Sequence, residues 1–197
     1  ALSVPQKKIF CFGDSLTAGT RTSLYAPHLE QKLRNNYAYG CGSAMVRFKG
    51  YPGWTTKTLF EGGGLGSTLD KVESAAGKVD LAIILAGTND LAYDSDADSI
   101  FNTLRKIHGV AHSRQIKTIA VGIPPSAWQQ QSSVAREVAG KVNAKLQEMN
   151  LRMMVGSRHL CPFQSQILIG VVDIGVVMDY IFPQKAIVFL VKAWRQL

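Results

Sequence analysis

The stretch Ile9-Phe10-Cys11-Phe12-Gly13-Asp14-Ser15-Leu16-Thr17-Ala18-Gly19 decides the fold. It begins as an apolar run and then turns on Gly13, with Ser15 at the bend. In open α/β proteins such a serine stands where a strand passes into a helix, at the carboxyl edge of a parallel sheet, where ligands bind. The stretch therefore predicts a displayed hydroxyl at a sheet edge. A plainer interpretation is a turn followed by a helix N-cap, because Asp14, Ser15 and Thr17 are all favourable capping residues.

Downstream, apolar runs alternate with amphipathic segments, as they do in an α/β domain. The run 79–86 is almost continuously apolar, which is typical of a central parallel strand buried on both faces. We expect one domain over residues 1–197, folded as a three-layer αβα sandwich around a flavodoxin-like parallel sheet of about five strands. Further strands are predicted at 37–42 and 117–123, and helices at 23–36, 67–76, 97–112 and 132–149.

Three of these segments carry specific expectations. In the first helix, His28 is expected to be partly buried. The glycine-rich stretch 62–66 lacks the Gly-Lys-Ser/Thr of a phosphate loop and is predicted to be a flexible link. The last helix is predicted to bury the residues that recur every four positions along it, Val134, Val138, Val142 and Leu146.

Charge and cysteine content exclude several classes of protein. The net charge is +8 over 197 residues, but the basic residues are scattered and the longest run is Lys7-Lys8. Nucleic-acid binding is therefore not expected, because it needs a clustered basic face. The three cysteines, Cys11, Cys41 and Cys161, cannot all pair with each other and lack metal-ligand spacing, so buried reduced thiols are predicted.

No membrane-spanning or targeting segment is evident in the sequence. The region 166–191 is the longest apolar one, but Asp173, Asp179 and Lys185 interrupt it, and charged residues are costly in lipid. It is interpreted as one or two buried strands. The first eight residues contain no apolar signal-peptide core, which favours the cytoplasm as the compartment. The sequence leaves the oligomeric state open.

Three short blocks resemble, in order, those of the GDSL or SGNH hydrolases, a family of esterases, lipases, thioesterases and carbohydrate deacetylases. The blocks are Gly13-Asp14-Ser15-Leu16, Gly50-Tyr51-Pro52-Gly53-Trp54-Thr55-Thr56 and Gly87-Thr88-Asn89-Asp90. The resemblance implies that Ser15 is the nucleophile and that the N–H groups of Ser15 and Gly53 and the side chain of Asn89 bind an oxyanion. It implies a small-molecule ester as the substrate, with no metal or other cofactor.

The residue types at these positions suit that chemistry. A glycine at 53 lets the backbone approach a substrate carbonyl without a Cβ in the way. The Asn89 amide donates hydrogen bonds without a proton that it can lose. Asp90 is predicted to be structural, holding its loop through nearby backbone N–H groups. Trp54 and Trp128 are candidates for the walls of a substrate pocket, although Trp54 also suits a role in covering the core.

The fourth family block, Asp-x-x-His near the C-terminus, is missing from the sequence. A serine nucleophile needs a general base, and the family's base is the histidine of this block. The best alignment, Asp179-Tyr180-Ile181-Phe182, has phenylalanine in its place. His159 is the last histidine and lacks an aspartate three residues before it, so it is a base only if it has been recruited separately.

A shift of reading frame offers an explanation for the missing block. Reverse translation of 178–187, regrouped one base earlier, can encode Asp-Gly-Leu-His-Phe-Ser-Pro-Lys-Gly-Tyr, in which glycine and leucine are forced. This product looks like the family block. We therefore interpret about 150–197 as an atypical segment arising from a frameshift between about Glu148 and His159.

Several other functions stay open at this stage. A catalytically impaired binding module, a carbohydrate deacetylase and a flavodoxin-like nucleotide or flavin binder all fit the same fold. His108 and His112 lie four apart on one helix face, but no third ligand or glutamate base accompanies them, so zinc is not expected. The aspartates at 94, 96 and 98 are better explained as helix caps than as a calcium loop, which needs glycine and glutamate where Ser99 and Arg105 stand.

Overall fold

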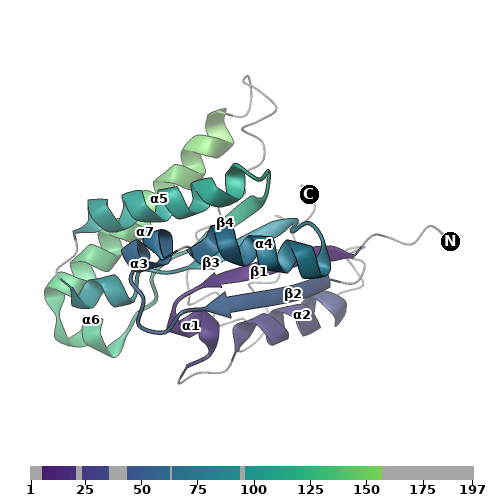
Figure 1. The fold of residues 1–197 in the computed structure, drawn as a ribbon. Coiled ribbons are helices and arrows are strands. Elements are labelled where there is room, and N and C mark those ends of the chain that lie inside the picture. The colour runs from purple at the N-terminus through teal and green to yellow at the C-terminus, as the bar shows by residue number, and fades with distance from the viewer. Residues whose placement is uncertain (1–5, 21–23, 36–43, 63, 94–95, 157–197) are drawn as a thin grey trace.

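The computed structural model describes residues 6–20, 24–35, 44–62, 64–93 and 96–156, and it shows an α/β domain (Figure 1). A four-stranded sheet with the order β2-β1-β3-β4 runs through these residues, and all three strand pairs are parallel. The strands are β1 Lys7–Gly13, β2 Ala44–Gly50, β3 Leu81–Leu85 and β4 Lys117–Val121. About five strands were expected, and four lie in the described part of the chain.

Helices cover both faces of the sheet, which confirms the three-layer sandwich (Figure 1). Helix α2 (Tyr25–Asn35) packs on one face. The opposite face carries α3 (Thr56–Glu61), α4 (Gly64–Ala76), α5 (Ala97–His112) and α7 (Ser133–Gly156). Three shorter helical segments sit in loops: α1 (Ser15–Ala18), the 3-10 helix η2 (Asn89–Ala92) and α6 (Ala127–Gln131).

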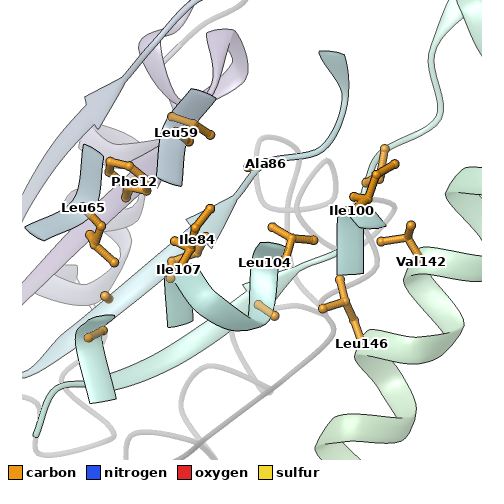
Figure 2. Close-up of a cluster of buried hydrophobic side chains, with 14 of the residues drawn as sticks. Phe12, Leu59, Leu65, Ile84, Ala86, Ile100, Leu104, Ile107, Val142 and Leu146 are labelled. Atoms are coloured by element: carbon orange, nitrogen blue, oxygen red, sulfur yellow. The ribbon is translucent and has the colours of Figure 1, made fainter. Parts of the chain in front are cut away.

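The alternation of side chains along β1 divides the core into two clusters. Phe10 and Phe12 face α4 and α5, whereas Ile9 and Cys11 face α2, because successive strand residues point to opposite faces. All four side chains are buried. Figure 2 shows the larger cluster, in which Phe12 and Ile84 of the sheet lie among residues of α3, α4, α5 and α7. The core thus fixes β1, the strand that leads to Ser15, from both sides.

The sequence predicted some elements closely and missed others. Helix α5 occupies 97–112 as predicted, and its N-cap Asp96 accepts a hydrogen bond from the Ser99 N–H at 2.9 Å. Strand β2 is not among the strands that the sequence predicted. Residues Arg47 to Lys49 are exposed because β2 lies at the edge of the described sheet. Only the first three residues of β2 therefore show the alternation of buried and less buried side chains that is typical of a strand. The strand predicted at 37–42 and the segment 166–191 lie outside the described residues.

Three further expectations need correction. Val134 is 66% exposed, and α7 instead buries Ala135, Ala139, Val142 and Leu146, a spacing that follows the 3.6-residue turn more closely than strict steps of four. His28 is exposed on the outer side of α2. Helix α4 begins at Gly64, inside the stretch predicted as a flexible link.

Two other predictions from the sequence concern the cysteines and membrane-spanning segments. Cys11 is a buried free thiol, as predicted, and Cys41 and Cys161 lie outside the description. Across residues 6–156, gaps aside, we find no helix that combines the length and the apolar character needed to cross a bilayer.

Candidate active site

Ser15 stands at the carboxyl edge of the sheet because β1 ends in a turn that only glycine fits. A Cβ on Gly13 would lie 1.9 Å from the carbonyl oxygen of Leu85 on the neighbouring strand. The next residue, Asp14, donates its backbone N–H to that oxygen at 3.2 Å. Asp14 also caps α1, since its Oδ1 accepts from the Leu16 N–H at 3.0 Å. The capping and nucleophile-turn interpretations are therefore compatible, and Ser15 is the half-buried first residue of α1.

The loop with Gly53 follows β2 at the same edge. Gly13 pairs with Gly50 across the two strands, and the Tyr51 N–H donates to the Gly13 carbonyl at 2.9 Å. Gly53 is exposed and has φ of +81°, which favours glycine, and a Cβ there would meet nothing within 4 Å. The residue is therefore required for its backbone conformation, and the protein leaves open space beside it.

Asn89 follows β3, the strand on the other side of β1. Its Nδ2 donates to the carbonyl of Trp54 at 2.8 Å, so Asn89 lies against the residue next to Gly53. An amide nitrogen carries two hydrogens, and this bond uses one of them. Asn89 is half-buried, and this bond leaves its second amide hydrogen unused. The structure thus brings the Ser15, Gly53 and Asn89 loops to one place.

Asp90, next to Asn89, ties the second and third loops together. Its Oδ2 accepts from the Thr56 N–H at 2.9 Å, and its Oδ1 accepts from the Thr56 hydroxyl at 2.6 Å. Asp90 therefore has a structural role through a backbone N–H, as predicted, and that N–H belongs to Thr56 of the second loop. Thr56 was not singled out from the sequence, because a buried threonine at the start of a helix has no distinctive pattern.

A second buried carboxylate, that of Asp14, lies beneath the nucleophile turn. Burial, with a smaller contribution from the charge of Asp90, raises the pKa of Asp14 to about 6, although the hydrogen bond from the Leu16 N–H opposes the rise. Burial likewise raises the pKa of Asp90, and the bonds from Thr56 oppose that rise. Asp90 of the third loop bonds to Thr56 of the second, whereas the buried Oδ2 of Asp14 and Oγ1 of Thr88 have no hydrogen-bond partner among the described residues.

The two tryptophans occupy loops that follow the outer strands of the sheet. Trp54, after β2, stacks on Tyr51 with ring centroids 4.4 Å apart and packs against the core. Trp128, in α6 after β4, is 50% exposed, and its Nε1 donates to the Leu91 carbonyl at 3.2 Å. Trp54 therefore has the core-covering role that the sequence allowed, and Trp128 is fastened to the η2 loop with half of its surface exposed.

Comparison with known protein families gives a match over most of the chain. The model of the GDSL-like Lipase/Acylhydrolase family matches residues 11–156, which is more than half of the chain. The chain belongs to this family. None of the curated proteins matches it significantly in sequence.

Solved structures of SGNH and acetyl esterases share the fold. The chain is 21% identical to AlinE4, an SGNH-hydrolase family esterase, over 76% of this chain and 73% of that one, with a TM-score of 0.54. An acetyl esterase mutant crystallised with acetate ion gives 16% identity, coverage of 86% and 81%, and a TM-score of 0.56. Est24, a carbohydrate acetylesterase from Sinorhizobium meliloti, is 20% identical over 73% of this chain and 81% of that one, with a TM-score of 0.51.

None of the histidines that the structure describes lies at this GDSL site. His28 is exposed on α2. His108 and His112 both contact the Thr118 hydroxyl, with ring nitrogens 2.8 Å from its oxygen, and Thr118 lies in the first half of β4, away from the carboxyl ends of the strands. Burial, with a smaller contribution from the charge of His112, lowers the pKa of His108 to about 3. His159, Asp179 and Phe182 lie outside the described residues.

The described part of this GDSL family member also holds no set of metal ligands. No group of three or more His, Cys, Asp or Glu side chains in it is arranged to bind an ion. The pair His108 and His112 instead shares one threonine hydroxyl, and the sequence alone did not indicate that partner.

Proposed function

We propose that this protein is a serine ester hydrolase that acts on small acyl esters through an acyl-serine intermediate. One observation carries the proposal: three hydrogen-bond donors lie on three loops at one edge of the sheet, beside a serine displayed at the end of β1. They are the N–H of Ser15, the N–H of Gly53 and the Nδ2 of Asn89. Donors fixed in this way stabilise an oxyanion better than water does, because they need no reorganisation during the reaction.

The reaction has two halves in this proposal. The Ser15 Oγ attacks the ester carbonyl, its proton passes to a base, and the negative charge that develops on the carbonyl oxygen is held by the three donors. The alcohol leaves with a proton and an acyl-serine remains. Water then attacks the acyl group by the same route and releases the acid. No metal is required for either half.

The base is the part of this account that the chain as written does not supply. Asp14 is buried and caps its own turn, Asp90 is buried against Thr56, and the described histidines lie elsewhere. We therefore propose that the transcript carries an Asp-x-x-His block in another frame after about Glu148. The end of the family match at residue 156 supports this, because it falls inside the interval 148–159.

Sequencing the mRNA across codons 148–197 tests the frameshift directly. We expect the regrouped frame, and we expect the chain that it encodes to hydrolyse p-nitrophenyl acetate in a manner abolished by Ser15→Ala. A transcript that confirms the present frame would sink the frameshift idea.

The chain in its present frame should show little esterase activity. Loss of the base of a catalytic triad typically costs several orders of magnitude in rate. Turnover of p-nitrophenyl acetate, measured for the chain and for His159→Ala, checks this expectation. Strong turnover that disappears in His159→Ala would contradict it and would show that His159 has been recruited as the base.

A second candidate function is a binding module that retains the oxyanion pocket without turnover. The placement of His108 and His112 away from Ser15 favours it. Tight binding of an ester or acid without hydrolysis would support this alternative. Among hydrolase substrates, acetyl esters are our first choice and carbohydrate acetyl groups the second, because acetylesterases are among the structural neighbours.

A further inference from the structure

Asp90 makes an unusually complete set of contacts with one residue of the neighbouring loop. The Asp90 side chain is buried, with 3% of the residue exposed, and Thr56 is 1% exposed. Both carboxylate oxygens lie within hydrogen-bond distance of the Thr56 N–H, at 2.9 and 3.2 Å, and Oδ1 also accepts from the hydroxyl at 2.6 Å. Among the described residues, no cation forms an ion pair with Asp90.

Capping of α3 explains only part of the contacts of Asp90. The Thr55 hydroxyl oxygen accepts from the Thr58 N–H at 3.2 Å, and Asp90 accepts from the Thr56 N–H at the same helix end. Burial of a carboxylate without a cation is costly, and burial raises the pKa of Asp90 accordingly. Asp90 also accepts from the Thr56 hydroxyl, so it fixes the side chain of Thr56 as well as its backbone N–H.

The contacts of Asp90 restrain the loop that carries the Gly53 N–H, the donor whose residue has no side chain. Gly53 has no side chain, and a Cβ at its position would meet nothing within 4 Å, so side-chain packing does not fix its N–H. The loop is instead fastened just after it, at Trp54 by Asn89 and at Thr56 by Asp90. Asn89 and Asp90 are consecutive residues of η2, so the Gly53 loop and the Asn89 amide share one anchor.

We propose that Asp90 is a positioning residue for the oxyanion pocket, holding Thr56 so that the Gly53 N–H and the Asn89 amide keep their relative placement. This role rests on the proposed function of Ser15, Gly53 and Asn89. Asp90 touches no substrate in this account. It acts through Thr56, and its effect should fall on the reactive step rather than on initial binding.

The experiment uses the chain translated from the sequenced transcript, which we expect to carry the regrouped frame and its base. It measures how fast a fluorophosphonate probe labels Ser15 of that chain, with kinact and KI determined separately. The test variants are Asp90→Asn and Thr56→Val, and Thr56→Ser is the variant that keeps the hydroxyl. Asp80→Asn is the matched control, because Asp80 also accepts a backbone N–H, that of Lys8 at 2.8 Å, but at the amino end of β3. Denaturation midpoints are recorded for every variant.

The proposal predicts a fall in kinact of about tenfold to a hundredfold for Asp90→Asn, with KI unchanged, because small misplacements of catalytic donors cost rates of this order. Thr56→Val should show a smaller fall, whereas Thr56→Ser and Asp80→Asn should stay near the wild-type rate. Amide hydrogen exchange at Gly53 and Thr56 should become faster in Asp90→Asn and not in Asp80→Asn.

The outcomes separate this role from the proposed function. If wild type is labelled but Asp90→Asn and Thr56→Val react at the wild-type rate, the positioning role is wrong and the nucleophile stands. If Asp80→Asn slows labelling as much as Asp90→Asn, the effect is one of general stability and the role is also wrong. If wild type is not labelled at Ser15, the proposed function fails, and the positioning role fails with it. If Asp90→Asn does not fold, the comparison of Thr56→Val with Thr56→Ser tests the role instead: slower labelling in Thr56→Val alone supports it, and equal rates contradict it.

Discussion

At the scale of single residues, glycines shape the site in two different ways. Gly13 and Gly50 are needed for space, since a Cβ on Gly50 would lie 2.2 Å from the Ala18 nitrogen and one on Gly13 would lie 1.9 Å from the Leu85 oxygen. Gly53 is needed for its positive φ, in open surroundings. Gly13 lets β3 approach the end of β1, Gly50 lets α1 approach the end of β2, and Gly53 lets the loop after β2 adopt a positive φ.

Substitution of Gly13 should therefore unfold the nucleophile turn. Gly13→Ala should lower the free energy of unfolding by about 3 kcal/mol or more, because the nearest atom that its Cβ meets is the backbone oxygen of Leu85, which cannot move aside. Gly140→Ala, in the exposed interior of α7 with nothing within 4 Å, is the control and should raise that free energy by about 0.5–1 kcal/mol. Urea denaturation measures both. A Gly13→Ala protein as stable as wild type would show that the close approach does not matter.

At the scale of elements, α5 and β4 are joined by a polar contact within the core. His108 is 2% exposed, and its Nδ1 and the His112 Nε2 both lie 2.8 Å from the Thr118 hydroxyl oxygen. The buried Nε2 of His108 has no hydrogen-bond partner among the described residues. Protonation of His108 would place a charge in this apolar layer, which is why its pKa falls to about 3.

This contact should make the fold sensitive to acid. The His108 pKa is lower in the folded state than in the unfolded state, so the unfolded chain binds more protons between about pH 6.5 and pH 3, and stability falls as the pH drops through that window. At pH 5 the loss from His108 is about 2 kcal/mol relative to pH 7.5. Urea titrations at both pH values, on wild type and on His108→Gln, isolate this loss, since Asp14 contributes equally to both proteins.

The pKa of Asp14 changes stability with pH in the opposite direction, and its contribution cancels when wild type is compared with His108→Gln. Its folded pKa of about 6 lies above the ordinary value of 3.8, so its contribution is complete below about pH 3.8 and is lost as the pH rises through 6. If His108→Gln loses as much stability between pH 7.5 and pH 5 as wild type does, His108 is not the group responsible.

At the scale of the whole molecule, the sequence was most informative where one local pattern dominates. The apolar run at 79–86 and the capped helix at 97–112 were predicted because burial on both faces and amphipathic spacing leave clear marks. Strand β2 was missed because an edge strand with Arg47 and Lys49 exposed does not look like one. The buried face of α7 was misplaced by one residue at Val134 because tertiary packing selects the face.

The candidate site shows the same division between local and distant information. Ser15, Gly53 and Asn89 were singled out as candidates because each stands in a short motif, and motifs are local. Asp90 was predicted to be structural from such a motif, but its partner Thr56 was not identified, since the two residues are 34 positions apart in the sequence and meet only in the fold. His108, His112 and Thr118 are likewise brought together by the packing of α5 on β4.

Identification of the residue that carries a covalent probe tests the central claim most directly. The chain translated from the sequenced transcript, with the base that the regrouped frame supplies, is incubated with a fluorophosphonate. Two variants of that chain are treated in the same way: Ser15→Ala, and Ser133→Ala, which removes another serine that begins a helix. Peptide mass spectrometry should place a single adduct on Ser15 in wild type and in Ser133→Ala, and Ser15→Ala should carry none. An adduct on any other residue, or equal labelling of Ser15→Ala, would contradict the assignment of Ser15 as the nucleophile.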